Sequence, residues 1–478
     1  MTLDKISTDH YPSRETRETE KRAGASVRQR EAYYSPRSVY ADEGEAAHER
    51  RQPSRGRGGA GKSSRKGIRK GLSESWREMS HVLGNKQLAF DKPLVIIVML
   101  LLALGLIMVY SASYAYAYYN NGDSMYYIKR QIVFAAIGVL AMIGISTVPP
   151  RRLKGKPTYF VLGISYFLLV AVLFLPRVQG VRRWINLGFT TFQPSEIAKF
   201  AAILICATYI SNHYKEMNVT SYPNVETKLK ANRSPFAHWR YSMRRNFVTA
   251  VVPFIVILGP MLALVVIEPH LSCTILLMLI IGTQMYLGGT RKEYFIGLGV
   301  LAAIAVYLVI FTDIVPYGST RIKVWQDPFV DPLGDGWQNI QSLYAISSGG
   351  LFGVGLGNSR QKYLYISEPQ NDFIFAVVCE ELGLIGAMAI ILLFAAFIWR
   401  GFTVSVSNPD RFCKLVGIGI TSQIGFQMIL NICVVTNMVP NTGISLPFFS
   451  SGGTSLTMLL AEIGVLLAIS RSSPNKVI

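Results

Sequence analysis

Three aspartates lie at a regular four-residue spacing in the stretch VWQDPFVDPLGDGWQ, residues 324–338. Asp327 and Asp331 each precede a proline, and Asp-Pro steps favour turns, so solvated acids in a turn-rich loop are one interpretation. The other interpretation is chemical, because Arg321 and Lys323 lie immediately upstream. A carboxylate beside fixed cations can act as a general base toward a hydroxyl, while the cations bind a phosphate or diphosphate.

Further charged residues lie beside or within apolar runs. Arg182 and Arg183 occur in a polar stretch, and Glu196 and Lys199 follow at the start of an apolar run. Ser195 and Glu196 can be interpreted as a helix start, with a cap and a first-turn acid. That interpretation leaves Lys199 unexplained, because an ionisable group inside a membrane span is costly and usually faces the protein interior.

Two other segments are unusual for their apolar surroundings. Glu380 and Glu381 lie within an apolar run, which indicates pairing of one of them with a basic residue that the sequence does not identify. Residues 437–455, NMVPNTGISLPFFSSGGTS, are polar and punctuated by glycine and proline between two apolar runs. Non-helical backbone at membrane depth must be buried in protein or line a cavity, so this segment is interpreted as re-entrant or cavity-lining, with an ordinary outer loop as the alternative.

The cysteines and histidines exclude several kinds of site. The five cysteines are scattered in or beside apolar runs without a CxxC pair, and the six histidines do not cluster. We therefore interpret the cysteines as buried apolar side chains, and we expect neither zinc hydrolase nor serine hydrolase chemistry. The net charge of +19 does not indicate nucleic acid binding, because about 20 of the 48 lysines and arginines precede the first apolar run.

The elements that must position these residues are membrane helices. Only 16% of the residues are charged, whereas soluble proteins carry about 25%. Apolar runs long enough to cross a bilayer recur from Lys92 onward. We predict an all-α polytopic membrane protein with about ten transmembrane helices, at 93–112, 131–148, 158–175, 195–212, 248–267, 271–288, 293–312, 373–399, 413–436 and 455–470.

The distribution of basic residues predicts the orientation. The basic segments that fall on one side, which the positive-inside rule makes cytoplasmic, are 1–92, 151–156, 213–247, 290–294 and 400–414. The other side receives a long extracytoplasmic loop at 313–372, between helices 7 and 8. Arg182 and Arg183 also fall on this outer side, against the usual bias, which indicates either an anionic ligand or statistical scatter.

The chain divides into three parts by composition. Residues 1–92 are polar, basic and without apolar periodicity, which is typical of a disordered tail attracted to anionic lipid. We expect the transmembrane domain at 93–470 and a short cytoplasmic C-terminal tail at 471–478.

Four long motifs, in this order within residues 90–470, resemble the SEDS family of FtsW, RodA and SpoVE. They are GVRRWINLGFTTFQPSEIAKF, QDPFVDPLGDGWQNIQSLYAISSGGLFGVGLGNS, NDFIFAVVCEELGLIGA and NMVPNTGISLPFFSSGGTSL. The resemblance implies ten helices in the cytoplasmic membrane, with both termini cytoplasmic and the active site extracytoplasmic. It also implies polymerisation of lipid II into glycan strands, with a class B penicillin-binding protein transpeptidase and other divisome proteins as partners.

The family pattern DPxxDPxGxGWQ implies a role for the opening acids. Its essential acid falls on Asp331, whereas Asp327 and Asp335 are expected to shape turns. Asp331 would remove a proton from the acceptor 4-hydroxyl, whose oxygen attacks the anomeric carbon of the donor sugar on undecaprenyl diphosphate with inversion. No cofactor is certain, although a divalent cation (Mg or Mn) could assist the leaving diphosphate. The candidate substrate-binding residues, inferred from charge and side, are Arg182, Arg183, Glu196, Lys199, Arg321, Lys323 and Asp327.

The chain departs from the family pattern at three positions. His270 replaces a common aspartate, Ser272 a common glycine and Thr442 a common basic residue, so no role carries over to them. The stretch SLPFFSSGGTS favours FtsW and SpoVE over RodA, and hence cell division. The alternatives are a lipid II flippase and a non-catalytic divisome scaffold. Transporters often have repeated halves and charges near the bilayer midplane, whereas here the unusual residues gather on one face.

Overall fold

The computed structural model describes residues 90–177, 181–188, 190–218, 235–268, 270–300, 322–334 and 336–473. Nearly all of the expected N-terminal tail lies outside the described residues, as do 474–478 of the expected C-terminal tail. Arg321, Asp335 and most of the predicted seventh helix also lie outside them.

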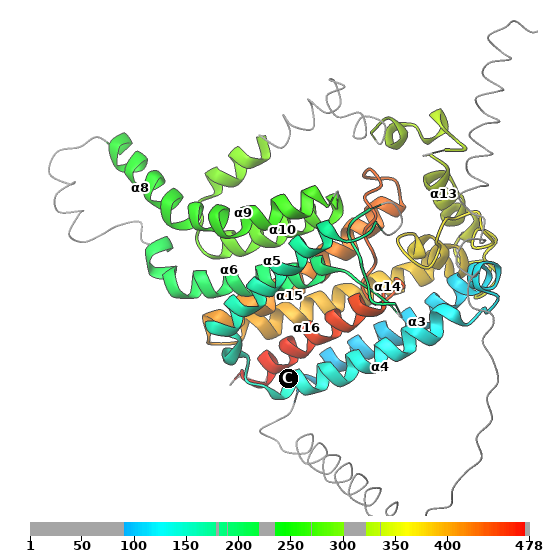
Figure 1. Cartoon of the computed structure of the whole chain (residues 1–478), viewed down its shortest axis with the longest axis horizontal. Helices are drawn as coiled ribbons and strands as arrows, with labels where there is room; N and C mark the ends of the chain where they lie inside the picture. The colour runs from blue at the N-terminus through cyan, green and yellow to red at the C-terminus, as the bar shows by residue number, and fades with distance from the viewer. Residues whose placement is uncertain are drawn as a thin grey trace, which may run out of the picture. The chain divides into compact units, whose positions relative to one another are not determined.

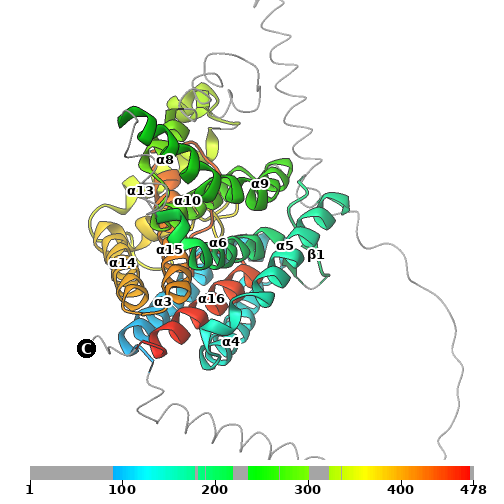
Figure 2. The same cartoon turned by 90° about the vertical axis from the view of Figure 1, so that its left-hand side faces the viewer.

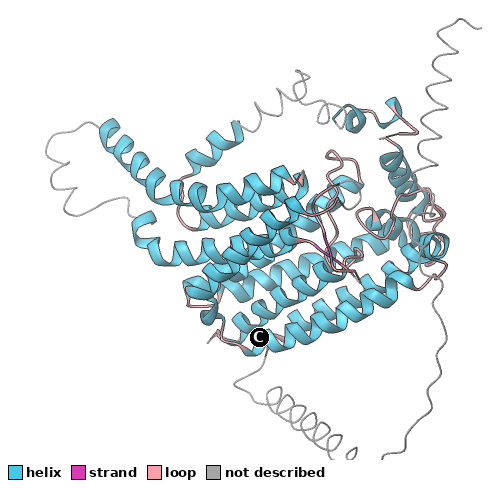
Figure 3. Cartoon of the chain, in the orientation of Figure 1, coloured by secondary structure: helices cyan, strands magenta, loops and turns pink. Residues whose placement is uncertain are grey.

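The described part of the chain is almost entirely helical, as Figures 1 and 3 show, which confirms the predicted fold class. Eight of its helices are long and apolar enough to cross a membrane. Nine of the ten predicted runs fall on helices, and the count of ten stays a prediction because the seventh run is mostly undescribed. The helices of the bundle are α3 (Lys92–Asn121), α4 (Tyr126–Thr147), α5 (Lys156–Phe174), α6 (Pro194–Asn218), α8 (Pro235–Ala250), α9 (Val252–Ile267), α10 (Leu271–Leu287), α14 (Ile374–Val406), α15 (Arg411–Val435) and α16 (Gly453–Arg471).

Three helices form the centre of the bundle, which Figure 2 views along its length. Most residues of α6, α15 and α16 are buried, whereas α4 and α5 expose most of their apolar surface. The alanines Ala198, Ala201 and Ala202 of α6 are fully buried, and small side chains let helices approach closely where lipid supplies no hydrophobic drive. Outer apolar side chains such as Phe174, 84% exposed, suit a bilayer rather than water.

The basic loops meet at one end of the bundle. Arg400 forms an ion pair with Asp91 at 2.7 Å, and Arg151 forms one with Asp410 at 3.1 Å. The Arg411 guanidinium lies 3.4 Å from the centre of the Tyr214 ring. These contacts bring together four of the segments that the sequence places on one side of the membrane.

The opposite end carries more structure than the sequence indicates. The polar stretch that contains Arg182 and Arg183, predicted on the outer side, is followed by a hairpin of β1 (Ile185–Asn186) and β2 (Thr191–Phe192). The loop predicted at 313–372 is not irregular throughout, because it contains the short 3₁₀ helix η3 (Pro328–Val330) and α13 (Trp337–Gly349). At 13 residues α13 is too short to span a bilayer, so it does not stand out as an apolar run in the sequence.

A kink in α14 holds the loop that follows α13. Gly383 has non-helical backbone with φ of 67° inside the helix. The freed carbonyl of Glu380 accepts a hydrogen bond from the Val354 N–H at 3.0 Å. The freed carbonyl of Glu381 accepts one from the Gly355 N–H at 3.1 Å. A side chain at Gly353 would overlap the Glu381 carbonyl, so glycine is required for this close approach.

Candidate active site

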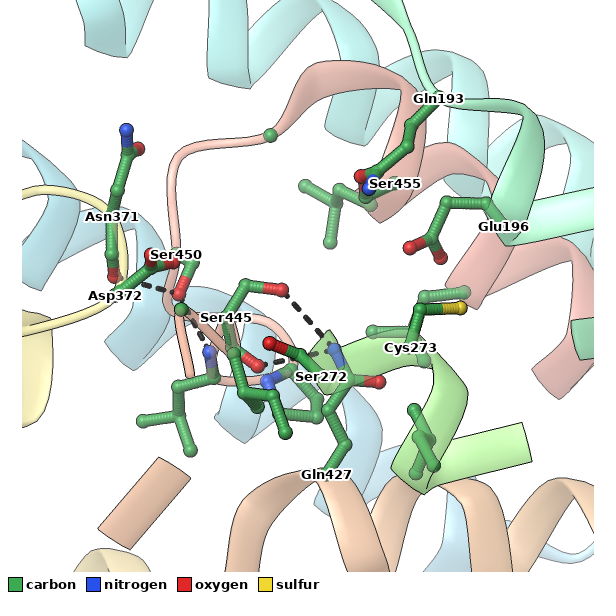
Figure 4. Close-up of a pocket in the computed structure, with 18 of the residues that line it drawn as sticks. Gln193, Glu196, Ser272, Cys273, Asn371, Asp372, Gln427, Ser445, Ser450 and Ser455 are labelled. Atoms are coloured by element: carbon green, nitrogen blue, oxygen red, sulfur yellow. Dashed lines mark hydrogen bonds between the residues drawn. The ribbon is translucent and has the colours of Figure 1, made fainter. Parts of the chain in front are cut away.

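A polar cavity of about 370 Å³ lies at the end of the bundle opposite the Asp91–Arg400 pair. Figure 4 shows Gln193 and Glu196 on one side of it and Asn371 and Asp372 on the other. Its walls come from the segment before α6, the starts of α6, α10 and α16, the middle of α15, the loop before α14 and the segment between α15 and α16. A cavity of this size, with both polar and apolar side chains in its lining, can receive the headgroup of a lipid.

The segment between α15 and α16 forms one wall, so the cavity-lining interpretation of residues 437–455 is confirmed. Its non-helical backbone is held by side chains of α15: Gln427 donates to the Ser445 carbonyl (3.1 Å) and Asn431 to the Ile444 carbonyl (2.7 Å). Within the segment, the Ser450 hydroxyl accepts from the Leu446 N–H at 2.7 Å. These bonds satisfy backbone groups that would otherwise be costly at membrane depth.

A buried ion pair lies at the start of α6, which forms one wall of the cavity. Lys199 is 3% exposed, and its Nζ lies 2.9 Å from the Glu196 carboxylate. Pro194 is the first helical residue, so Ser195 is not the N-cap that the helix-start interpretation required. The Ser195 hydroxyl instead hydrogen-bonds the His270 ring at 3.4 Å.

Arg183 brings a second cation to the cavity. Its Nε donates to the backbone carbonyl of Glu268 at 3.1 Å. Burial raises the pKa of the Glu268 carboxyl to about 8, although the Arg183 guanidinium opposes this, so the acid is mostly protonated at neutral pH. A neutral Glu268 therefore does not cancel the charge of the Arg183 guanidinium, which lines the cavity.

His270 and Ser272, two of the residues that differ from the expected family pattern, lie in the same wall of the cavity. Burial lowers the pKa of His270 to about 3, with Arg183 and Lys199 adding to the effect, so the ring is neutral at physiological pH. The Ser272 hydroxyl donates to the Thr442 carbonyl, which ties α10 to the segment between α15 and α16. These side chains act on the shape of the cavity and contribute no charge to it.

The structure places Asp331 outside this cavity lining, on an exposed turn. The N–H groups of Gly334 (3.3 Å) and Gly336 (3.1 Å) donate to the Asp331 backbone carbonyl. A side chain on Gly336 would overlap the Pro328 carbonyl. The glycines of the motif are therefore explained by the tight turn that presents Asp331.

The turn is fastened to the cavity wall. Trp325 donates from its indole N–H to the Asn437 carbonyl at 3.0 Å, and the Asn437 amide donates back to the Trp325 carbonyl at 3.2 Å. Asn339 of α13 also donates to the Asn437 side chain at 3.0 Å. Asn437 is therefore the junction between the Asp331 turn and the start of the segment that lines the cavity.

One of the two acids of α14, Glu381, does have a basic partner, which confirms the expected pairing. The Lys362 Nζ lies 2.8 Å from Glu381, and both side chains are almost completely buried. Glu381 also accepts from the Ser111 hydroxyl of α3 at 2.6 Å. Glu380 accepts from the Arg360 N–H at 2.8 Å. This cluster fixes the loop whose later residues, Glu368 to Asp372, reach the cavity.

The described residues do not offer a ready three-ligand metal site. No group of three His, Cys, Asp or Glu side chains in this part of the chain is arranged to hold an ion. The cations that the described cavity itself supplies are Arg183 and Lys199.

The sequence-predicted residues thus separate into two groups. Arg183, Glu196 and Lys199 line the cavity, whereas Arg182, Lys323, Asp327 and Asp331 do not. Sequence reasoning missed Glu368, Asn371 and Asp372, and also Gln423, Gln427 and Asn431 of α15. The three polar residues of α15 recur every four residues on one face of an apolar helix, and that spacing was a usable signal.

Comparison with known proteins gives consistent results. Residues 92–475 match the profile of the FtsW, RodA and SpoVE family, described as cell cycle proteins. The chain is 41% identical to stage V sporulation protein E of Bacillus subtilis (strain 168), over 74% of this chain and 90% of that protein. It is 32% identical to the probable peptidoglycan glycosyltransferase FtsW of Geobacter sp. (strain M18), over 73% of this chain and 88% of that protein.

Solved structures share the fold. A chain from a peptidoglycan synthase complex that coordinates polymerization and crosslinking matches with a TM-score of 0.62 at 26% identity, over 81% of this chain and all of that one. The rod shape determining protein RodA of Thermus thermophilus matches with a TM-score of 0.55 at 24% identity, over 81% of this chain and 99% of that one.

Proposed function

The chain belongs to the FtsW, RodA and SpoVE family of cell cycle proteins, and on that premise we propose that it is a peptidoglycan glycosyltransferase that polymerises lipid II during cell division. It is a multi-pass membrane protein. In the proposed orientation both termini are cytoplasmic, and the cavity and the Asp331 turn face the outside of the cytoplasmic membrane.

The observation that carries the proposal is the polar cavity with Arg183 and a buried Lys199 at the end of an otherwise apolar bundle. Lys199 is paired with Glu196 at 2.9 Å, which offsets the cost of burying it at a membrane span, and an anionic ligand in the cavity would lie close to this pair and to Arg183. Lipid II has the matching chemistry: a diphosphate between a lipid tail and a saccharide. The tail would remain in the bilayer while the cavity receives the diphosphate.

In the proposed mechanism Asp331 is the general base. Its carboxylate takes the proton of the acceptor 4-hydroxyl, and that oxygen forms a bond to the anomeric carbon of the donor sugar. The bond from that carbon to the undecaprenyl diphosphate breaks with inversion, and the diphosphate leaves with the electron pair. Arg183 and Lys199 stabilise the charge that develops on it. Asp331 suits the acceptor side because its exposed turn is fastened to the outer start of the cavity wall.

The partner proposed is a class B penicillin-binding protein that cross-links the strands, together with other divisome proteins. The similarity to a chain from a synthase complex that combines polymerization and crosslinking supports this. A division role is supported by the FtsW relatives, while the similarity to a sporulation protein supports a related role in spore formation.

The test is strand formation from labelled lipid II by the purified full-length protein, with and without its transpeptidase partner. We expect glycan strands when the partner is present. If no strands form but labelled lipid II crosses the bilayer of proteoliposomes, the protein is a flippase instead. If neither occurs, and cells whose copy of the protein lacks polymerising activity still divide, the protein is a scaffold.

Arg183→Gln is expected to raise the KM for lipid II by about 10- to 100-fold. Loss of a hydrogen bond to a charged group costs about 1.5–3 kcal/mol, and each 1.4 kcal/mol is tenfold in affinity. Arg182→Gln is the matched control, because Arg182 is exposed and does not line the cavity. The KM is measured from steady-state rates over a range of lipid II concentrations. Equal changes of KM in both variants would contradict a specific role for Arg183.

A further inference from the structure

Three carboxyl groups line the cavity, and two of them have partners within the described chain. Glu196 is paired with Lys199 at 2.9 Å. Glu368 accepts a hydrogen bond from the Asn371 amide at 2.7 Å. The third, Asp372, has no hydrogen bond or ion pair to its carboxylate from any described residue. Asp372 is therefore the cavity acid whose bonding capacity remains for a ligand.

The backbone around Asp372 is held firmly while its side chain lines the cavity. The Asp372 carbonyl accepts from the Asn431 amide at 2.8 Å, and the Asn371 carbonyl accepts from the Ser450 hydroxyl at 2.9 Å. A Cβ at Gly443 would lie 3.2 Å from the Asp372 carboxylate. Figure 4 shows Asp372 across the cavity from Glu196. A partly buried carboxylate without partners is costly, and an arrangement this well fixed is suited to a ligand that supplies the missing donors.

The charge of Asp372 selects the part of the ligand that it can contact. A carboxylate repels a diphosphate, which belongs with Arg183 and Lys199. It accepts hydrogen bonds from neutral donors, such as sugar hydroxyls and N-acetyl N–H groups. We infer that Asp372 contacts the saccharide of the lipid-linked substrate while Arg183 and Lys199 contact its diphosphate. The inference rests on the proposed function, because it takes lipid II as the ligand of the cavity.

Two probes separate the saccharide from the diphosphate. Fluorescent lipid II carries both groups, whereas undecaprenyl diphosphate has no sugar. In Asp372→Asn we expect lipid II to bind about 10-fold more weakly, because the neutral amide loses a charged hydrogen bond. Undecaprenyl diphosphate should bind equally well or more tightly, because a negative charge near it has been removed. In Arg183→Gln both probes should bind more weakly.

The pH dependence gives a second readout that a purely structural role would not change. Burial and, to a smaller extent, the Glu368 carboxylate raise the pKa of Asp372 to about 6, while the Arg183 guanidinium opposes them. His270 and the Glu196–Lys199 pair also face the cavity, and its lining residues from α15 and α16 are uncharged. Because the carboxylate is the binding form, lipid II affinity should fall as the pH drops through about 6. This fall should be absent in Asp372→Asn, and in Glu368→Gln it should move to lower pH.

The outcomes distinguish this inference from the proposed function. The saccharide contact would be overturned if Asp372→Asn weakened the binding of both probes equally. It would also be overturned if lipid II affinity still fell at low pH in this variant as it does in the wild type. If the wild type forms no strands, the proposed function fails, yet a selective loss of lipid II binding in Asp372→Asn would still support the contact. If the Asp372→Asn variant fails to fold, the pH dependence of lipid II binding is compared between the wild type and Glu368→Gln. The inference is overturned if the fall in affinity at low pH occurs at the same pH in both proteins.

Discussion

Replacing Asp331 by asparagine is expected to slow glycan polymerisation by about 10²- to 10⁴-fold, which is the usual contribution of a general base. The amide has nearly the same size as the carboxylate but cannot take the proton of the acceptor hydroxyl. The turn should survive, because Gly334 and Gly336 donate to the backbone carbonyl of Asp331, which the substitution leaves in place. Initial rates of strand formation from labelled lipid II, with the transpeptidase partner present, measure the effect.

Asp327→Asn is the matched control for Asp331→Asn. Asp327 is also an exposed acid before a proline in the same motif. Its side chain accepts from the Phe329 N–H at 3.0 Å as the cap of η3, and an asparagine can cap in the same way. The rate should therefore change little. Comparable losses in both variants would show that the turn needs its shape or charge rather than a base at Asp331.

Gly334→Ala tests the position of the proposed base without removing it. A methyl group on Gly334 would occupy the space of the Asp331 carboxylate, so the carboxylate must move. We expect a slower rate at unchanged thermal stability, because the obstructing group is the end of an exposed side chain. A wild-type rate in this variant would mean that the carboxylate position is not important for the reaction.

Sequence reasoning succeeded where the signal is local. The spans were predictable because lipid requires about 20 consecutive apolar residues per helix, and the predicted bounds of α15 and α16 lie within two residues of the observed ones. The wall at 437–455 was predictable because glycine, proline and polar residues between spans have few permitted locations. The same argument from cost predicted that a basic residue would pair with one of the two acids Glu380 and Glu381, and Glu381 is the acid that pairs with Lys362.

What could not be predicted depends on contacts between distant segments. Lys362 lies 19 residues from Glu381 and 251 from Ser111, and no periodicity joins these positions. The difference between Asp372 and Glu368 is of the same kind, because both look like loop acids in the sequence. Only the folded chain gives Glu368 an amide partner and leaves Asp372 facing the cavity. Likewise, Arg182 and Arg183 are adjacent in the sequence, but only Arg183 lines the cavity.

Lys362→Met is expected to destabilise the protein by about 3–5 kcal/mol, the usual cost of leaving one charge of a buried pair without its partner. Lys362 is 2% exposed and Glu381 is fully buried, so water cannot replace the lost ammonium. The lysine also donates to the Gly357 carbonyl at 2.6 Å, and methionine cannot. Thermal unfolding of the purified protein in detergent should show a midpoint several degrees lower.

Lys129→Met is the matched control, because Lys129 and Asp123 form a pair of similar length, 2.7 Å, with side chains that are 63% and 44% exposed. Solvent screens such a pair, so the midpoint should hardly move. Adding Glu381→Gln to Lys362→Met should recover part of the loss, since the uncompensated charge is then gone while the Ser111 hydroxyl keeps a partner. If Lys362→Met unfolds at the same temperature as Lys129→Met, the buried cluster does not stabilise the loop. The position of Asp372 must then depend on its bonds to α15 and the cavity wall alone.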